Sequence, residues 1–320
     1  MNDDHFVSAT VARSIDTSPA ITRYSNSQMD SILGHALPVL DHGFIRVMDY
    51  MGGDADITEA ARVSYARGTK KTSDDQGLLN YLMRHHHSTP FEMCEIKLHV
   101  KLPLFVARQW VRHRTASINE MSARYSILDK EFYFPSDKVL AAQSSINGQG
   151  RDETTKYLDG DAVLSILHEA CDDAYGDYEN LHTVGTYEDN QGFTHTGKGL
   201  SRELSRMVLP TNIYTQWYWK TNLHNLFNFL RLRMDHHAQY EIRVYADLIH
   251  TIVQDWVPMA SSAFQNYKLN SINFSQKELA ALNIIMMDFA YTDAEFRMST
   301  GELREFKEKV RNIKKANFYK

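Results

Sequence analysis

Cysteine is scarce in this sequence. Its 320 residues include two cysteines, Cys94 and Cys171, which do not form a Cys-x-x-Cys pair. Disulfide frameworks and zinc knuckles need several cysteines at short spacings. Neither is indicated here, and a reducing compartment is expected.

Long apolar runs are also missing. No stretch approaches the roughly 20 apolar residues that a membrane-spanning helix needs. The first residues, Met1-Asn2-Asp3-Asp4-His5, carry acids where a secretory signal has basic residues. We therefore expect a cytoplasmic protein with no membrane partner.

The sequence also lacks an excess of basic residues. Lys and Arg number 35 against 40 Asp and Glu, which gives a formal net charge of -5. A protein whose whole surface binds nucleic acid is usually basic, so clustered arginines point instead to a local anion site. The apolar and charged fractions, 43% and 23%, are those of an ordinary globular protein.

The order of predicted elements indicates an α+β fold, with a mixed or antiparallel sheet flanked by helices in a single large domain. The clearest strand is 93–102, where apolar residues alternate with polar ones. Further strands are predicted at 44–51, 132–134 and 213–219. Helices are predicted at 57–66, 73–84, 104–111, 163–181 and 238–256, and one more from residue 222.

Composition divides the chain further. Residues 1–42 are polar and predicted as an extended arm, 43–256 form the main domain, and 137–198 form a loop-rich insertion within it. Residues 257–320 are predicted as a helical C-terminal extension. There, 275–278 and 299–302 both have the form of capping boxes that start helices.

The most unusual stretch is 112–126, which contains Arg112, His113, Arg114, Glu120 and Arg124 with few aliphatic residues. Charged residues are mostly exposed, so a solvated basic face would explain the first triplet taken alone. A dense set of donors in an acidic protein also suits the binding of an anion. The predicted helix before it would place Gln109, Arg112 and His113 on one face.

Two other segments have polar groups without a core role, at 89–92 and 206–237. A charge-assisted hydrogen bond contributes about 1.5–3 kcal/mol net. If the three segments converge, two or three of their arginines could therefore hold a phosphorylated ligand. The helix from residue 222 also carries several asparagines, which are poor helix formers and suggest a hydrogen-bonding surface.

Two other functions fit parts of the sequence. A metal-dependent nucleotide hydrolase would use the histidine-rich positions His85, His87, Asp235, His236 and His237. A nucleic-acid-binding protein would use the basic face of the last predicted helix, although such a face is more often simply solvated.

The arginine stretch resembles a known family. Arg112-His113-Arg114, seven residues and then Ser122 match the Arg-His-Arg-x7-Ser signature of the flavin-dependent thymidylate synthases. Segments 87–92 and 228–239 are similar to further segments of that family, in the same order. The resemblance covers roughly 43–256, interrupted at 137–198.

The resemblance implies the thymidylate synthase-complementing protein fold and a reaction. The enzyme would convert dUMP to dTMP with methylenetetrahydrofolate as one-carbon donor and NADPH-reduced FAD as mediator and hydride source. It would be a homotetramer with active sites between subunits, without a metal and without a nucleic-acid partner. Residues 43–256 would be its catalytic domain.

The resemblance also assigns residues to ligands. The dUMP site would contain Gln109, Glu120, Ser122, Arg124, Arg206 and Arg233. The FAD site would contain Thr89, Glu92, Arg112, His113, Arg114, Asn222, His224, Asn228, Leu232 and His237. The catalytic candidates are Arg233, Ser122 and Glu120. A serine without a neighbouring base is a weak nucleophile, so Ser122 is expected to bind phosphate or base.

Overall fold

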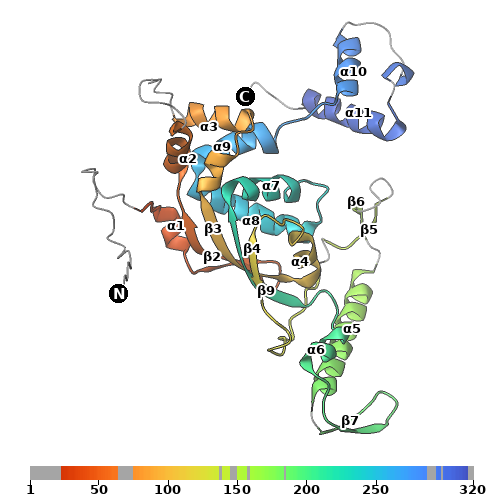
Figure 1. Cartoon of the computed structure of the whole chain (residues 1–320). Coiled ribbons are helices and arrows are strands. Elements are labelled where there is room, and N and C mark those ends of the chain that lie inside the picture. The colour runs from red at the N-terminus through yellow and green to blue at the C-terminus, as the bar shows by residue number, and fades with distance from the viewer. Residues whose placement is uncertain are drawn as a thin grey trace, which may run out of the picture. The chain divides into compact units, whose positions relative to one another are not determined.

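The computed structural model describes residues 23–63, 75–136, 139–144, 150–156, 159–183, 185–286, 293–296 and 298–315. The chain divides into two compact units, Met1–Ser261 and Ser262–Lys320, which are described separately. Figure 1 shows the course of the chain and the labels of its elements.

A five-stranded sheet in the order β1-β2-β3-β9-β4 forms the centre of the first unit. Its strands are β1 (Ala36–Val39), β2 (Gly43–Met51), β3 (Glu95–Pro103), β9 (Tyr214–Asn222) and β4 (Ser117–Glu120), and every neighbouring pair is antiparallel. The predicted strands at 44–51, 93–102 and 213–219 are confirmed, and so is the α+β class.

One face of this sheet is covered by helices α4 (Leu104–Trp110), α7 (Leu223–Arg233) and α8 (Tyr240–Trp256), which contact β2, β3 and β9. The alternation in β3 explains this, since Ile96, Leu98 and Val100 are buried while Lys97 and His99 lie on the other face. The sheet therefore has one core face and one polar face.

An aromatic cluster fixes the end of α4 against α7. Trp110, the last residue of α4, lies 5.4 Å from Trp219 of β9 and 4.7 Å from Phe229 of α7, measured between ring centroids. All three side chains are buried. Because large buried rings allow little movement, the residues that follow Trp110 and those that follow Phe229 have fixed positions relative to one another.

Before β3 the chain forms α2 (Asp54–Arg62), α3 (Asp75–Arg84) and a 3-10 turn, η1 (Thr89–Met93). Helix α2 begins at Asp54 rather than at the predicted Ile57, because the Asp56 carboxylate accepts from Gly53 N at 2.7 Å and caps the first turn. Residues 64–66 of that predicted helix, and 73–74 of the next, lie outside the described residues.

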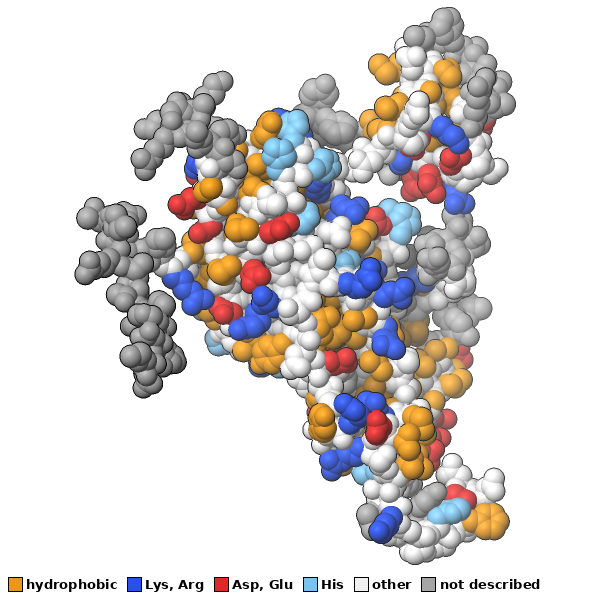
Figure 2. All heavy atoms as spheres, in the orientation of Figure 1, with side chains coloured by type: hydrophobic (Ala, Val, Ile, Leu, Met, Phe, Trp, Pro, Cys, Tyr) orange, Lys and Arg blue, Asp and Glu red, His pale blue; other side chains and the backbone are white. Residues whose placement is uncertain are grey.

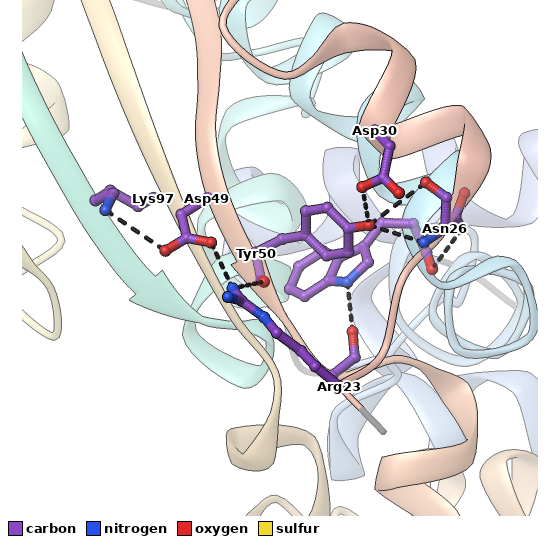
Figure 3. A network of polar contacts seen from close by, with 8 residues as sticks. Arg23, Asn26, Asp30, Asp49, Tyr50 and Lys97 are labelled. Carbon is purple, nitrogen blue, oxygen red and sulfur yellow. Dashed lines mark hydrogen bonds and ion pairs between the residues drawn. The ribbon is translucent and has the colours of Figure 1, made fainter. Parts of the chain in front are cut away.

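The prediction of an extended arm for residues 1–42 is wrong over its described part. Residues 27–32 form α1 (Ser27–Ile32), and 36–39 form the edge strand β1. Asn26 caps α1 and donates to the Asp255 carbonyl at 2.8 Å, and Tyr50 of β2 donates to Asp30 (Figure 3). These contacts with distant residues, which local composition does not reveal, hold the segment in place.

The insertion contains more regular structure than predicted. It holds the long helix α5 (Gly160–His182) and two small hairpins, β5 (Ala141–Gln143) with β6 (Arg151–Lys156) and β7 (Gly185–Glu188) with β8 (Thr194–Gly197). The short helix α6 (Arg202–Ser205) and the turn η2 (Arg206–Val208) follow and contact α5. The two hairpins correct the prediction that the insertion at 137–198 is mainly loop outside its helix.

The predicted strand at 132–134 is wrong. Phe132 makes one isolated bridge to Ile213, and its ring packs 6.1 Å from Tyr175 of α5. The apolar run is explained by a buried cluster with Tyr175 and Tyr178 of α5. Burial against helices, rather than strand pairing, accounts for Phe132 in this cluster and for Tyr133, which donates to Glu241 of α8.

The second unit is a small helical body. After α9 (Pro258–Phe264) and the π-helical turn η3 (Gln265–Leu269), it contains α10 (Gln276–Met286), η4 (Asp293–Phe296) and α11 (Thr300–Lys315). Ala281, Phe296 and Phe306 form its core. Both predicted capping boxes are confirmed, with Ser275 N donating to Glu278 and Ser299 N donating to Glu302.

Candidate active site

Three predicted site residues meet where α4 and α7 end. The Nε of Arg233, the last residue of α7, donates to Nε2 of His113 at 3.0 Å, and its Nη2 donates to the Gln109 carbonyl at 3.1 Å. The His113 ring packs edge-on against Phe229 at 5.0 Å. The aromatic cluster around Trp110 therefore extends directly to the guanidinium group of Arg233.

The electrostatics of this pair are set by burial. Burial, and then the positive charge of Arg233, lower the pKa of His113 to about 4, so the imidazole is neutral at neutral pH. Burial also lowers the pKa of Arg233, which nevertheless stays charged at neutral pH. In the described ranges no carboxylate pairs with Arg233, so its positive charge is not compensated.

The predicted helical face of Gln109, Arg112 and His113 is wrong, because α4 ends at Trp110 and the chain turns. His113 N donates to the Trp110 carbonyl within that turn. The Gln109 side chain instead donates to the side chain of Gln239, just before α8. Gln109 and His113 thus both contact Arg233 because the chain turns after α4, and not because they share a helical face.

A second group of predicted residues surrounds α6. Arg124 approaches Glu203 with an Nη1–Oε1 distance of 3.9 Å, and the Nε of Arg206 donates to the Glu203 carbonyl at 3.2 Å. Ser122 Oγ accepts from Arg124 N, and Arg202 donates to the Tyr125 carbonyl at 2.8 Å. This group contains one carboxylate, that of Glu203, and three guanidinium groups, those of Arg124, Arg202 and Arg206. Its excess positive charge suits the binding of a phosphate.

Glu120 lies at the end of β4, where Thr215 Oγ1 of β9 donates to its Oε1 at 2.8 Å. Its carboxylate is exposed. Glu120 is therefore oriented by the sheet and remains able to accept another hydrogen bond. It lies two residues before Ser122 and joins the sheet to the second group.

The predicted FAD residues occupy exposed turns. Arg112 and Arg114 lie in the turn after α4 and make no hydrogen bond or ion pair with the residues that the structure describes. Thr221 Oγ1 donates to the Thr115 carbonyl and fixes this turn to β9. Two exposed arginines close together in the sequence and without an internal partner suit the diphosphate of a dinucleotide. Thr89 and Glu92 lie on η1, which contacts α7.

Other predicted FAD residues lie on or just after α7. Asn222 is the N-cap of α7, since its Oδ1 accepts from Asn225 N at 2.9 Å, so this asparagine stabilises the helix. Asn228 Oδ1 accepts from Arg231. His224 and Leu232 are exposed. The Nδ1 atom of His237 shares a hydrogen bond of 2.8 Å with the Asp235 carboxylate in the turn after α7.

The residues of the alternative metal site are only partly brought together. Asp235, His236 and His237 place their ligand atoms within 4.8 Å of one another, all on exposed side chains. His85 and His87 pack against Tyr81 of α3, with ring distances of 4.4 and 5.7 Å. The five-residue set proposed for a hydrolase is thus split between two turns.

Several contributors were not predicted from the sequence. Thr215 orients Glu120, and Glu203 and Arg202 complete the group around α6. The spacing Arg202-Glu203-x-x-Arg206 was a usable signal, because it places both arginines on one turn of helix. Figure 2 shows Lys and Arg side chains gathered over α4 and, separately, over α6.

Comparison with known proteins identifies a family for this chain. The family described as thymidylate synthase complementing protein matches residues 46–259. A flavin-dependent thymidylate synthase from Ruegeria pomeroyi is 55% identical over 88% of this chain and 90% of its own length. One from Rickettsia conorii is 54% identical, over 87% and 94%.

A solved structure is also similar. The UMP/dUMP methylase PolB from Streptomyces cacaoi, bound with 5-Br dUMP, superposes with a TM-score of 0.61 and 28% identity, covering 74% of this chain and all of that one. The chain belongs to the thymidylate synthase complementing protein family. The resemblance inferred from the arginine motif is confirmed.

In the part of the chain that the structure describes, none of the helices combines the length and the apolar composition of a membrane span.

Proposed function

We propose that this chain is a flavin-dependent thymidylate synthase, which converts dUMP to dTMP with methylenetetrahydrofolate, NADPH and FAD. The observation that carries the proposal is Arg233, a partly buried guanidinium fixed by two neutral acceptors and paired with no carboxylate among the described residues. A fixed cation of this kind suits a reaction in which negative charge develops. The 55% identity with a relative of that name supports the same reaction.

Arg233 acts on the pyrimidine of dUMP. Attack by C5 on an electrophilic carbon uses an electron pair of the ring, which becomes available when the ring holds negative charge on its carbonyl oxygen and N3. The Nη1 side of the Arg233 guanidinium group stabilises that charge, because the preorganised cation needs no reorientation when it develops. Gln109 lies beside it and binds the same ring.

Ser122, Arg124 and Arg206 hold the phosphate of dUMP. Their group has more guanidinium charge than carboxylate, and a phosphate accepts from several such donors at once. Ser122 binds and does not attack, because its Oγ accepts from Arg124 N and no histidine in the described ranges is bonded to it. Glu120 accepts a hydrogen bond from the nucleotide.

Arg112 and Arg114 hold the diphosphate of FAD, and Thr89, Glu92, His224, Asn228, Leu232 and His237 line the rest of that site. When bound, the reduced flavin supplies the hydride that completes the methyl group. The protein's own part is to hold the two ligands against each other at the end of α4.

The active site is completed between subunits of a homotetramer. The residues assigned to dUMP form two separate groups, one at Arg233 and Gln109 and one around α6, and no hydrogen bond joins them among the described residues. A second subunit that brings its α6 group to the Arg233 group makes one site.

The expected cytoplasmic location stays a prediction. The expected absence of a metal and of a nucleic-acid partner also stays a prediction.

The absorption spectrum of the purified protein tests the flavin assignment. We expect visible flavin absorption equivalent to on the order of one FAD per chain, either as purified or after adding FAD, because Arg112 and Arg114 suit its diphosphate. A protein that takes up no flavin, and that forms no dTMP with all four ligands present, contradicts the proposal. A colourless protein with bound metal and nucleotide hydrolysis would favour the alternative hydrolase.

A further inference from the structure

Arg233 is held from one side only. Its Nε donates to His113 Nε2 at 3.0 Å and its Nη2 donates to the Gln109 carbonyl at 3.1 Å. Within the described part of the chain, Nη1 has no partner. The protein therefore fixes the Nε side of the guanidinium group and leaves Nη1 to a ligand.

Both acceptors on the fixed side are uncharged. A carboxylate in the place of His113 would form a charge-assisted pair and would cancel much of the field of Arg233. The neutral imidazole orients the guanidinium group without removing its charge. It accepts through the ring nitrogen that lacks hydrogen, so in this arrangement Nδ1 carries the proton.

His113 is itself held firmly. Its backbone N donates to the Trp110 carbonyl, and its ring lies 5.0 Å from Phe229. Burial and the adjacent Arg233 lower its pKa to about 4, which keeps Nε2 unprotonated at neutral pH. A protonated imidazole could not accept from Arg233, so this environment preserves the bond.

We propose that His113 is a positioning residue for Arg233: its Nε2 fixes the guanidinium plane so that an uncompensated Nη1 faces the pyrimidine. This role rests on the proposed function and differs from the FAD contact that the family resemblance assigns to His113. It predicts that His113 affects the chemical step on dUMP more than the retention of flavin.

Two amide substitutions distinguish the roles, because they differ in which ring nitrogen they replace. In His113→Gln the amide reaches the position of Nε2, whereas in His113→Asn it reaches only that of Nδ1. His113→Glu keeps an acceptor near Nε2 but adds a negative charge. We would measure kcat and KM for dTMP formation, FAD content by absorbance, and thermal unfolding for all three variants.

The expected result is that His113→Gln stays within about 10-fold of the wild-type kcat, while His113→Asn and His113→Glu lose on the order of 10²-fold, as for the loss of one preorganised donor. KM for dUMP and FAD content should change little, because the interaction matters mainly in the transition state. Equal kcat in the three variants would overturn the positioning role, and so would losses that follow FAD content alone.

The wild-type protein, assayed in parallel, separates the two proposals. Wild-type protein that forms no dTMP contradicts the proposed function itself. Wild-type activity with a flat series of variants contradicts the role of His113 alone. If His113→Asn unfolds, the comparison of His113→Gln with His113→Glu, which have side chains of similar size, gives the decision.

Discussion

An excess of positive charge over internal carboxylate partners distinguishes the arginines of the candidate site. Arg112 and Arg114 have no partner among the described residues, Arg233 has only neutral ones, and the arginines near α6 outnumber their carboxylate. Other cations follow the opposite pattern, since Lys220 pairs with Glu95 at 3.1 Å. The unbalanced arginines are therefore those expected to meet an anionic ligand.

Replacing Arg206 by Gln should weaken dUMP binding. One charge-assisted hydrogen bond to phosphate is worth about 1.5–3 kcal/mol, so KM for dUMP should rise roughly 10- to 100-fold. FAD content should not change. Arg304→Gln on α11 removes the same charge from the second unit and serves as the control. An unchanged KM, or an equal rise in the control, would rule out Arg206 as a phosphate ligand.

At the scale of elements, the packing of helix α7 both stabilises the fold and positions a residue of the candidate site. Leu223, Leu226, Phe227, Phe229 and Leu230 are buried, while Arg233 emerges at its last turn. Burying such a side chain contributes about 1.5–3 kcal/mol. Packing of its first turns therefore keeps Arg233 in place.

Asn222→Ala should lower the stability of the first unit by about 1 kcal/mol, because the cap of α7 is lost. Asn222→Asp keeps an acceptor at the helix N-terminus and should retain stability. Denaturation followed by tryptophan fluorescence measures this, since all four tryptophans lie before residue 262. If Asn222→Ala kept its stability and lost FAD, Asn222 would be a ligand and its capping role secondary.

Some elements could be predicted from the sequence and others could not. Strand β3 was predictable because strict alternation reflects one buried face, and both capping boxes were predictable because they are local. Helix α1 and the segment at Phe132 were not, since Asn26 is held by Asp255 and Phe132 by Tyr175. Long-range contacts override local composition at those positions.

The same limit applies to the site. The arginine motif predicted candidate ligand-binding residues, because its residue types have no core role. It could not indicate that Gln109, His113 and Arg233 share one hydrogen-bonding group, which depends on where α4 ends. Nor could it indicate that Glu203 sits between Arg124 and Arg206.

At the scale of the whole molecule, the predicted site residues all fall within the first unit, Met1–Ser261, and the second unit has a core of its own. Within the first unit, the Arg233 group and the α6 group come from different elements. In the proposed tetramer, the body of one subunit joins the α6 group of another to make one site.

Mixed tetramers of two variants test this central claim most directly. Arg233→Ala and Arg124→Ala are each expected to form dTMP on the order of 10²-fold more slowly than wild type. Tetramers purified through a different tag on each variant should regain turnover at about a quarter of their sites, because random pairing in a symmetric assembly joins an intact Arg233 group with an intact α6 group.

Deuterium release from C5-deuterated dUMP gives the rate in each tetramer, and light scattering gives its mass. Recovered turnover in the mixed tetramers, with FAD bound throughout, is the result that the account predicts. Mixed tetramers as inactive as both parents, or an Arg233→Ala protein that turns over at the wild-type rate, would contradict it.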